Sequence, residues 1–137
     1  MIAYVDTSIV LFPLLGQGRG FDWEKWDFVY SSELLGLEAR RAIDKLRLEL
    51  AIDDAGVAEA HQELSRIERY LGVVPLSRAV LRRSALPMPT VVKTLDAIHL
   101  TSALILQENK RTPAAFATHD LQQATAAKAF GFEVFGI

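Results

Sequence analysis

Apolar positions along this chain alternate between short runs and longer segments with helical spacing. The short runs predict strands over residues 2–5, 28–30, 73–74, 114–117 and 132–135. Between them, apolar residues recur every three or four positions, which predicts helices over residues 8–15, 33–50, 54–71, 77–86, 94–109 and 120–130. Gly72 and Gly131 stand where two of these helices should end, because glycine commonly follows a helix.

Strands that are separated by helices indicate a parallel sheet that is covered on both faces. We therefore expect an α/β fold, namely a three-layer α/β/α domain with a central parallel sheet of about five strands. A glycine-rich loop over residues 16–20 and a proline-containing loop over residues 87–89 interrupt the pattern. The chain has 137 residues, which suits a single domain over residues 1–137.

The absence of cysteine narrows the chemistry that is open to the protein. It excludes a disulfide scaffold, a thiol nucleophile and cysteine-ligated zinc or iron–sulfur sites, so any metal must be held by oxygen or imidazole. No apolar run approaches the roughly 20 residues of a membrane span. The first residues lack a basic region and reach an aspartate at position 6, so they do not form a signal peptide and we expect a cytoplasmic protein.

The overall charge is close to neutral, with 15 basic against 17 acidic residues and a net charge of −2. A protein that binds nucleic acid through bulk charge has a basic excess, which this chain lacks. A nucleic-acid partner would therefore require a local basic stripe or bound metal ions.

Carboxylates occur where the predicted strands end. Asp6 directly follows the first strand and Asp120 follows the fourth, while Asp96 lies in the first turn of the helix before the fourth strand. Glu38 lies about one turn into the helix after the second strand. Ligands of such sheets bind beyond the carboxyl ends of the strands, so the four acids are expected to converge there. An acid-rich, cysteine-free cluster suits Mg²⁺ or Mn²⁺.

Each acid also has a purely structural explanation. Asp6 and Asp120 stand where a helix N-cap is expected, and capping is compatible with metal binding through the other oxygen. Asp96 near a helix start is favoured by the helix dipole in any case. Glu38 is the most informative, because it lies at the edge of the buried stripe of its helix, where a surface glutamate has no need to be.

Four short segments in this order resemble the PIN-domain ribonucleases, and specifically the VapC-like toxins of type II toxin–antitoxin systems. The resemblance spans nearly the whole chain, and its specificity comes from the order and spacing of motifs that are weak singly. The matching segments are Val5-Asp6-Thr7-Ser8, residues 31–42 (SSELLGLEARRA), Leu95-Asp96-Ala97-Ile98-His99-Leu100 and Ala117-Thr118-His119-Asp120-Leu121.

The resemblance implies a Mg²⁺-dependent endoribonuclease, with Mn²⁺ able to substitute, in which Asp6, Glu38, Asp96 and Asp120 are the catalytic and metal-binding residues. It implies hydrolysis of RNA by a metal-activated water, which leaves a 5′-phosphate and a 3′-hydroxyl. It also implies a cognate antitoxin that inhibits the enzyme, and a homodimer.

Several other residues are candidates for support of the site or for RNA binding. Thr7 and Thr118 match hydroxyl positions of the family, although either could simply cap or terminate a strand. His99 lies one turn after Asp96 on the same helix face, where a supporting role competes with that of a packed core histidine. Residues proposed to contact phosphates are Arg41, Lys45, Arg83 and Lys93, and a solvated helix face would explain such residues as well.

Two alternatives stay open. A non-catalytic PIN-like domain that binds RNA or regulates is the main competing function, and the complete set of four acids speaks against it. The helix over residues 33–50 also carries a second apolar stripe of Leu34, Leu37 and Leu48, which predicts a second neighbour. That neighbour is either another chain, an antitoxin or a second copy, or the following helix of the same chain.

Overall fold

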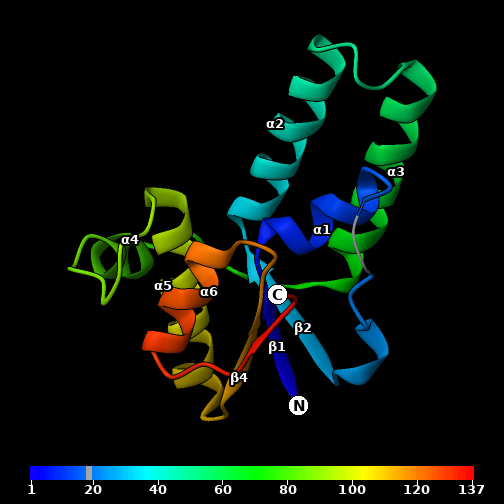
Figure 1. Cartoon of the computed structure of the whole chain (residues 1–137). Coiled ribbons are helices and arrows are strands. Elements are labelled where there is room, and N and C mark those ends of the chain that lie inside the picture. Colours follow the sequence, from blue (N-terminus) through cyan, green and yellow to red (C-terminus); the bar gives the residue numbers. More distant parts are fainter. Residues whose placement is uncertain (18–19) are drawn as a thin grey trace.

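Five parallel strands form the central sheet of the computed structural model, which describes residues 1–17 and 20–137 (Figure 1). The strand order is β3-β2-β1-β4-β5, with β1 in the middle. The expected α/β fold with a parallel sheet is therefore confirmed. The strands are β1 (Ile2–Val5), β2 (Phe28–Ser32), β3 (Gly72–Val74), β4 (Ala114–Ala117) and β5 (Val134–Phe135).

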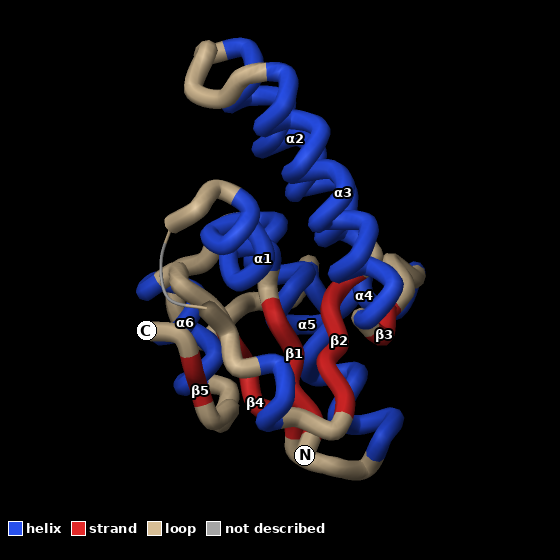
Figure 2. Tube along the Cα trace, turned by 90° about the vertical axis from the view of Figure 1, so that its right-hand side faces the viewer, coloured by secondary structure: helices blue, strands red, loops and turns tan. Residues whose placement is uncertain are grey.

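Helices cover both faces of the sheet, as expected for a fully parallel arrangement (Figures 1 and 2). Besides the short 3₁₀ helix η1 (Trp23–Lys25), they are α1 (Thr7–Leu14), α2 (Leu34–Leu48), α3 (Asp54–Tyr70), α4 (Arg78–Ser84), α5 (Thr94–Lys110) and α6 (Leu121–Ala129). Among the described residues, no helix is both long and apolar enough to cross a membrane.

Successive side chains of the central strands β1 and β4 point alternately to the two faces of the sheet, and each face has its own hydrophobic core. Tyr4 and Phe116 are fully buried on the face that α5 and α6 cover. Ala3 and Val5 point to the opposite face, where they pack with Ile9 of α1 and other apolar residues. Successive strand residues face opposite sides of a sheet, so one short strand supplies both cores and all of its residues except the first are buried.

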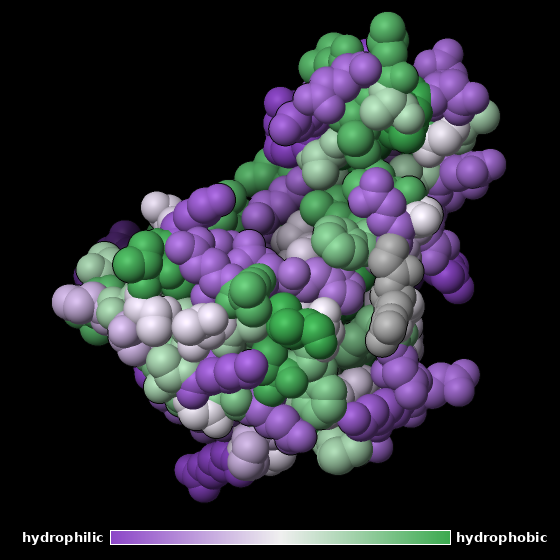
Figure 3. Space-filling model, viewed as in Figure 1, coloured by the Kyte–Doolittle hydropathy of each residue, from purple (hydrophilic) through white to green (hydrophobic). Residues whose placement is uncertain are grey.

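Helices α2 and α3 form an antiparallel hairpin that extends beyond the carboxyl ends of the strands (Figures 1 and 2). Its inner seam is apolar and continues onto α1, with Val10, Ala39, Ile43 and Leu64 buried together. The outer part of the hairpin is polar, apart from a hydrophobic tip that Figure 3 shows and to which the exposed Leu48 and Leu50 belong.

Most predicted boundaries differ from the structure by one or two residues, and two of the positions concerned have a clear physical cause. The first helix begins at Thr7 rather than Ser8, because Asp6 is its N-cap and its side chain accepts a hydrogen bond from the Ser8 amide. Gly72 follows the C-cap Leu71 of α3, as predicted, but it is also the first residue of β3, which begins one residue earlier than predicted, and it lies directly opposite Tyr30 in the ladder with β2. A Cβ at position 72 would overlap the Tyr30 ring, so this glycine permits the close approach of two strands.

The second apolar stripe of α2 does not exist as one surface. Leu34 is buried against Val80 of α4 and Ile98 of α5, so it belongs to a core cluster. Leu37 and Leu48 are 60% and 65% exposed, and α3 covers neither of them. The expectation that the next helix covers the stripe was therefore wrong, and only the two exposed leucines remain as candidates for contact with another chain.

The predicted glycine-rich loop over residues 16–20 lies partly outside the described residues. After it, Trp26 is buried in the core beneath η1, where its ring meets Phe135 edge-on at 5.3 Å between centroids. Trp23 instead lies at the surface of α1 and contacts Tyr70 of α3.

Candidate active site

Asp6 lies at the carboxyl end of the central strand β1 and is only 3% exposed. Its Oδ1 accepts hydrogen bonds from the Ser8 amide at 3.0 Å and from the Ser8 hydroxyl at 2.5 Å, and its Oδ2 accepts one from the Thr118 hydroxyl. The capping role that competed with the functional one is therefore real. The two roles share one side chain, because the first residue after the strand is also the residue before α1.

Asp120 is linked to Asp6 through the same hydroxyl. The Asp120 amide donates to Thr118 Oγ1 at 2.9 Å, and Asp120 Oδ1 accepts from the Gln123 amide at 2.9 Å as the N-cap of α6. The His119 amide also donates to Ser8 Oγ at 2.9 Å. Because β1 and β4 are neighbours in the sheet, these contacts bring their terminal carboxylates to one place.

Glu38 reaches the same end of the sheet from α2. Its Oε1 accepts from Thr7 Oγ1 at 2.7 Å and from His99 Nε2 at 2.6 Å, which joins α2 to α1 and α5. His99 is only 1% exposed, and its other ring nitrogen, Nδ1, lies 2.7 Å from the hydroxyl of Tyr4.

Asp96 differs from the other three acids. It lies in the first turn of α5, and its carboxylate accepts no hydrogen bond from any residue that the structure describes. Burial raises the pKa of Asp96, and so do the negative charges of Asp120, Asp6 and Glu38, against the opposing effect of His99. The other three acids thus lie close enough to Asp96 to affect its pKa, and the Asp96 carboxylate has no hydrogen-bond partner among the described residues.

Among the four acids, Asp6 and Glu38 also have shifted pKa values, and the two shifts have opposite directions. Burial raises the pKa of Asp6 above its usual value, although the hydrogen bonds from Ser8 and Thr118 oppose this effect. For Glu38, burial acts in the same direction, but hydrogen bonds from His99 and Thr7 outweigh it and lower the pKa. Glu38 is therefore held as a carboxylate, whereas Asp6 and Asp96 are ionised at a cost that a cation would relieve.

This cost predicts a pH-dependent effect of Asp96→Asn on stability in the absence of metal. The folded state raises the pKa of Asp96, so the contribution of this residue is most favourable below its ordinary value of 3.8 and is lost as the pH rises. The variant cannot ionise and should be more stable than the wild type at pH 7. Urea unfolding in EDTA should show that this gain shrinks at pH 4.5. A gain that grows toward low pH would contradict the sign.

The donor set fits a hard divalent cation. Among the described residues, no three acidic or histidine side chains are close enough together to ligate one ion directly. Mg²⁺ retains several water molecules and is usually bound through one or two carboxylates, so a fully assembled ligand cage is not required. Asp96, Oδ2 of Asp120 and the second oxygen of Glu38 accept no hydrogen bond from the described residues and so have free acceptor capacity.

The supporting residues that the sequence indicated all lie in this network, whereas the phosphate-binding candidates do not gather in one place. Arg41, Lys45 and Arg83 form ion pairs with Asp44, Glu49 and Glu108 respectively. Lys93 is exposed just before α5 and forms no ion pair within the described part of the chain. Lys93 lies three residues before Asp96, and Arg41 lies three residues after Glu38, but of these two only Arg41 is paired with a described acid.

Sequence reasoning missed three contributors. The sequence pattern marks Tyr4 only as part of an apolar strand, and Ser8 only as the start of a helix and the last residue of the first matching segment. Gln123 of α6 is buried, and its Nε2 donates to the backbone carbonyl of Asp96 at 3.2 Å. The available signal for Gln123 was a glutamine on a helix otherwise rich in alanine, which is weak evidence by itself.

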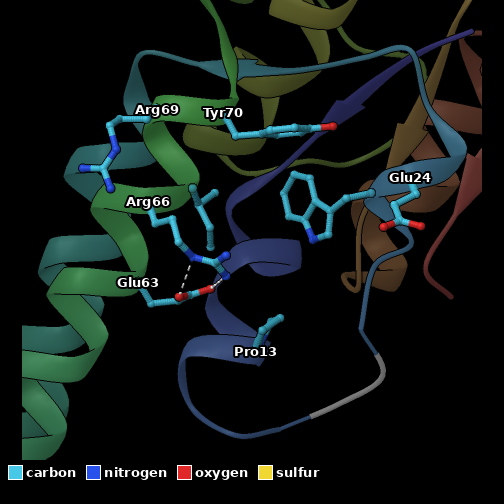
Figure 4. A pocket seen from close by; sticks show the side chains of 8 residues that line it. Pro13, Glu24, Glu63, Arg66, Arg69 and Tyr70 are labelled. Carbon is cyan, nitrogen blue, oxygen red and sulfur yellow. Dashed lines mark hydrogen bonds and ion pairs between the residues drawn. The ribbon is translucent and has the colours of Figure 1, made fainter.

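A separate hollow of about 530 Å³ lies between α1, η1 and α3, and none of the four acids lines it (Figure 4). The rings of Trp23 and Tyr70 meet edge-on there at 5.8 Å between centroids. Glu63 and Arg66 form an ion pair at its side, while Arg69 points away from that pair in Figure 4. Of the two tryptophans, Trp23 therefore lines this hollow, whereas Trp26 lies in the core.

No family model and no curated protein matches the sequence. Solved structures with a similar fold include the following three. VapBC2 from Rickettsia felis bound to a DNA fragment from their promoter has a TM-score of 0.60 and 11% identity, covering 98% of both chains. PAE2754 from Pyrobaculum aerophilum has a TM-score of 0.60 and 21% identity, covering 97% of this chain and 83% of the other. FitAB bound to the IR36 DNA fragment has a TM-score of 0.61 and 15% identity, covering 98% and 94%.

These similarities extend over nearly the full length of all the chains concerned, at identities that establish the fold alone. Together with the strand order and the helices on both faces, they identify the architecture of this chain as a PIN-like α/β fold.

Proposed function

We propose that this chain is a metal-dependent endoribonuclease of the toxin–antitoxin kind, which hydrolyses RNA phosphodiesters and is inhibited by a cognate antitoxin. One observation carries the proposal. Four carboxylates from β1, α2, α5 and the start of α6 meet at the carboxyl end of a PIN-like sheet, and the charges of the other three bear on Asp96.

Asp6, Glu38, Asp96 and Asp120 are the residues that would hold Mg²⁺ or Mn²⁺. When bound, such an ion would supply Lewis acidity, a water of lowered pKa and neutralisation of the phosphate charge. The residues of the chain contribute orientation. Ser8 and Thr118 hold Asp6 from both sides, and Thr7 with His99 holds Glu38, so these two carboxylates are restrained before any ligand arrives.

The choice of RNA as substrate rests on the sequence resemblance together with the charge of the site. A cluster of four acids repels a polyanion unless cations are present, so metal should be required for RNA binding as well as for cleavage. Lys93, which is exposed three residues before Asp96 and forms no ion pair with a described residue, is our candidate for contact with a phosphate beside the site.

The test is incubation of purified protein with a labelled RNA and either Mg²⁺, Mn²⁺ or EDTA. We expect cleavage in both metals, products with 5′-phosphate and 3′-hydroxyl ends, and no cleavage in EDTA. Undiminished activity in EDTA would disprove the metal mechanism. RNA binding without cleavage under all conditions would favour a non-catalytic RNA-binding or regulatory PIN-like domain.

The predicted partner contact can now be tested with separate residues. Leu37→Ser should leave the stability of the isolated chain within about 0.5 kcal/mol, because its side chain is already exposed. If a homodimer uses this side of α2, the variant should shift the mass measured by light scattering toward the monomer. Leu34→Ser should instead lower stability by about 2–4 kcal/mol through lost core packing.

Leu121→Ser is the matched control, because Leu121 is 68% exposed on α6. A mass that stays unchanged in Leu37→Ser would exclude this side of α2 from a dimer interface. The same variants can then be mixed with the product of a small neighbouring gene, if one is present, to test antitoxin binding.

A further inference from the structure

A buried chain of polar contacts runs from the middle of the sheet to the Glu38 carboxylate. The Tyr4 hydroxyl lies 2.7 Å from His99 Nδ1, and His99 Nε2 lies 2.6 Å from Glu38 Oε1. Tyr4 is fully buried, His99 is nearly so, and their rings meet edge-on at 5.9 Å between centroids. Three elements, β1, α5 and α2, are therefore joined by two hydrogen bonds that water cannot easily replace.

The direction of these hydrogen bonds follows from the chemistry of their ends. An ionised carboxylate can only accept, so the proton between His99 and Glu38 is on Nε2. With a proton on Nε2 and none on Nδ1, the lone pair of Nδ1 would accept the proton of the Tyr4 hydroxyl. Burial raises the pKa of Tyr4 well above its usual value, so this hydroxyl keeps its proton.

The hydroxyls of Ser31, Ser102 and Thr7 donate their hydrogen bonds to atoms other than His99 Nδ1. Ser31 donates to the carbonyl of Val5, and Ser102 donates to the carbonyl of Ile98, each at 2.7 Å. Thr7 lies 3.2 Å from His99 Nε2, but its hydroxyl donates to the same Glu38 oxygen at 2.7 Å. Among these hydroxyls, that of Tyr4 is the one within hydrogen-bond distance of His99 Nδ1.

Both donors act on one oxygen of Glu38. Oε1 receives Thr7 and His99, whereas Oε2 accepts no hydrogen bond from any residue that the structure describes. A carboxylate held in this way through one oxygen has a restricted rotamer and keeps its other oxygen available as an acceptor. Hydrogen bonds of this kind to ligating groups typically contribute 10- to 100-fold in metal affinity or activity, by order of magnitude.

We propose that His99, oriented by Tyr4, is a positioning residue that holds Glu38 with Oε2 directed at the divalent cation. This inference rests on the proposed function, since it assumes that Glu38 is a ligand. It differs from the simpler role of a histidine that fills the core, because that role affects stability but leaves metal affinity unchanged.

The experiment measures Mn²⁺ binding in the absence of RNA, by the loss of the free-ion signal in electron paramagnetic resonance. His99→Leu removes both ring nitrogens and keeps an apolar side chain of similar size. It should weaken Mn²⁺ binding by about 10- to 100-fold. Tyr4→Phe deletes only the hydroxyl and should weaken binding in the same direction by a smaller factor. His99→Gln, which restores an N–H donor near the position of Nε2, should recover part of the affinity.

A double-mutant cycle with Glu38→Gln separates positioning from general damage. If His99 acts through Glu38, Glu38→Gln with His99→Leu should bind Mn²⁺ no more weakly than Glu38→Gln alone. Tyr30→Phe is the matched control, because it removes a hydroxyl from the neighbouring strand β2, outside this chain of contacts. It should leave Mn²⁺ affinity at the wild-type value.

The possible failures can be distinguished. Wild-type Mn²⁺ affinity in His99→Leu and Tyr4→Phe, with lowered melting temperatures, would show that the pair is structural only and would overturn the inference while leaving the proposed function intact. If His99→Leu does not fold, Tyr4→Phe decides the question in the same way. A wild-type protein that binds no Mn²⁺, or a Glu38→Gln variant that binds it normally, would overturn the inference together with the ligand assignment on which it rests.

Discussion

Asparagine in place of Asp96 should abolish metal-dependent RNA cleavage and leave the fold intact. The Asp96 carboxylate accepts no hydrogen bond within the described residues, so the change removes charge without breaking a native contact. The negative charges of Asp120, Asp6 and Glu38 also add to the effect of burial in raising the pKa of Asp96. Because a supporting group already contributes 10- to 100-fold, loss of a ligand should lower the cleavage rate by more than about 100-fold. Single-turnover cleavage of a labelled RNA in Mg²⁺ is the measurement.

Asp54→Asn provides the matched control, since Asp54 also lies in the first turn of a helix but is exposed on α3, away from the sheet. It should cleave at the wild-type rate. We expect Asp6→Asn, Asp120→Asn and Glu38→Gln to be damaging as well. Cleavage by Asp96→Asn at the wild-type rate, with the same metal dependence, would show that the acids are not the catalytic centre.

Gly72→Ala should lower the free energy of unfolding by about 1–3 kcal/mol, although it adds only one methyl group. Gly72 and Tyr30 are direct neighbours in the parallel ladder of β3 and β2, and the added Cβ would overlap the Tyr30 ring. The ring lies against the backbone of β3, so relief requires the ring or the edge strand to move. Urea unfolding of the two proteins gives the difference.

Removal of the ring supplies the control for this clash. In a Tyr30→Ala background, the same Gly72→Ala change should cost little or nothing, because the space that the ring occupied is open. An equal cost in both backgrounds would place the effect in the backbone of β3 rather than in contact with Tyr30.

The periodicity of the sequence was sufficient for the order of the elements. Strands such as Ala114–Ala117 are short apolar runs, and helices such as Thr94–Lys110 carry apolar residues at helical spacing. Both patterns are local, because they follow from which side chains of one segment face the same way. The convergence of the acids was also predictable, since parallel strands all end at the same edge of the sheet.

Boundaries and neighbours were less predictable. Gly72 follows a helix, as expected of glycine, but a side chain is excluded there by Tyr30, which is 42 residues earlier in the chain and adjacent only in the folded sheet. Leu34 and Leu37 have the same side chain and lie one turn apart on α2. Only the position of α4 and α5 makes the first a core residue and leaves the second exposed.

The sequence by itself thus determined the fold class, the four acids and the end of the sheet at which they meet. Tertiary structure decided which groups hold those acids. Tyr4 reads as an apolar strand residue and His99 as a polar residue on a buried helix, and nothing in either segment indicates the other. Their hydrogen bond exists because β1 and α5, 95 residues apart at these positions, pack with both polar atoms in the interior. A buried polar atom is stable only with a partner, and which partner it meets is a property of the packing.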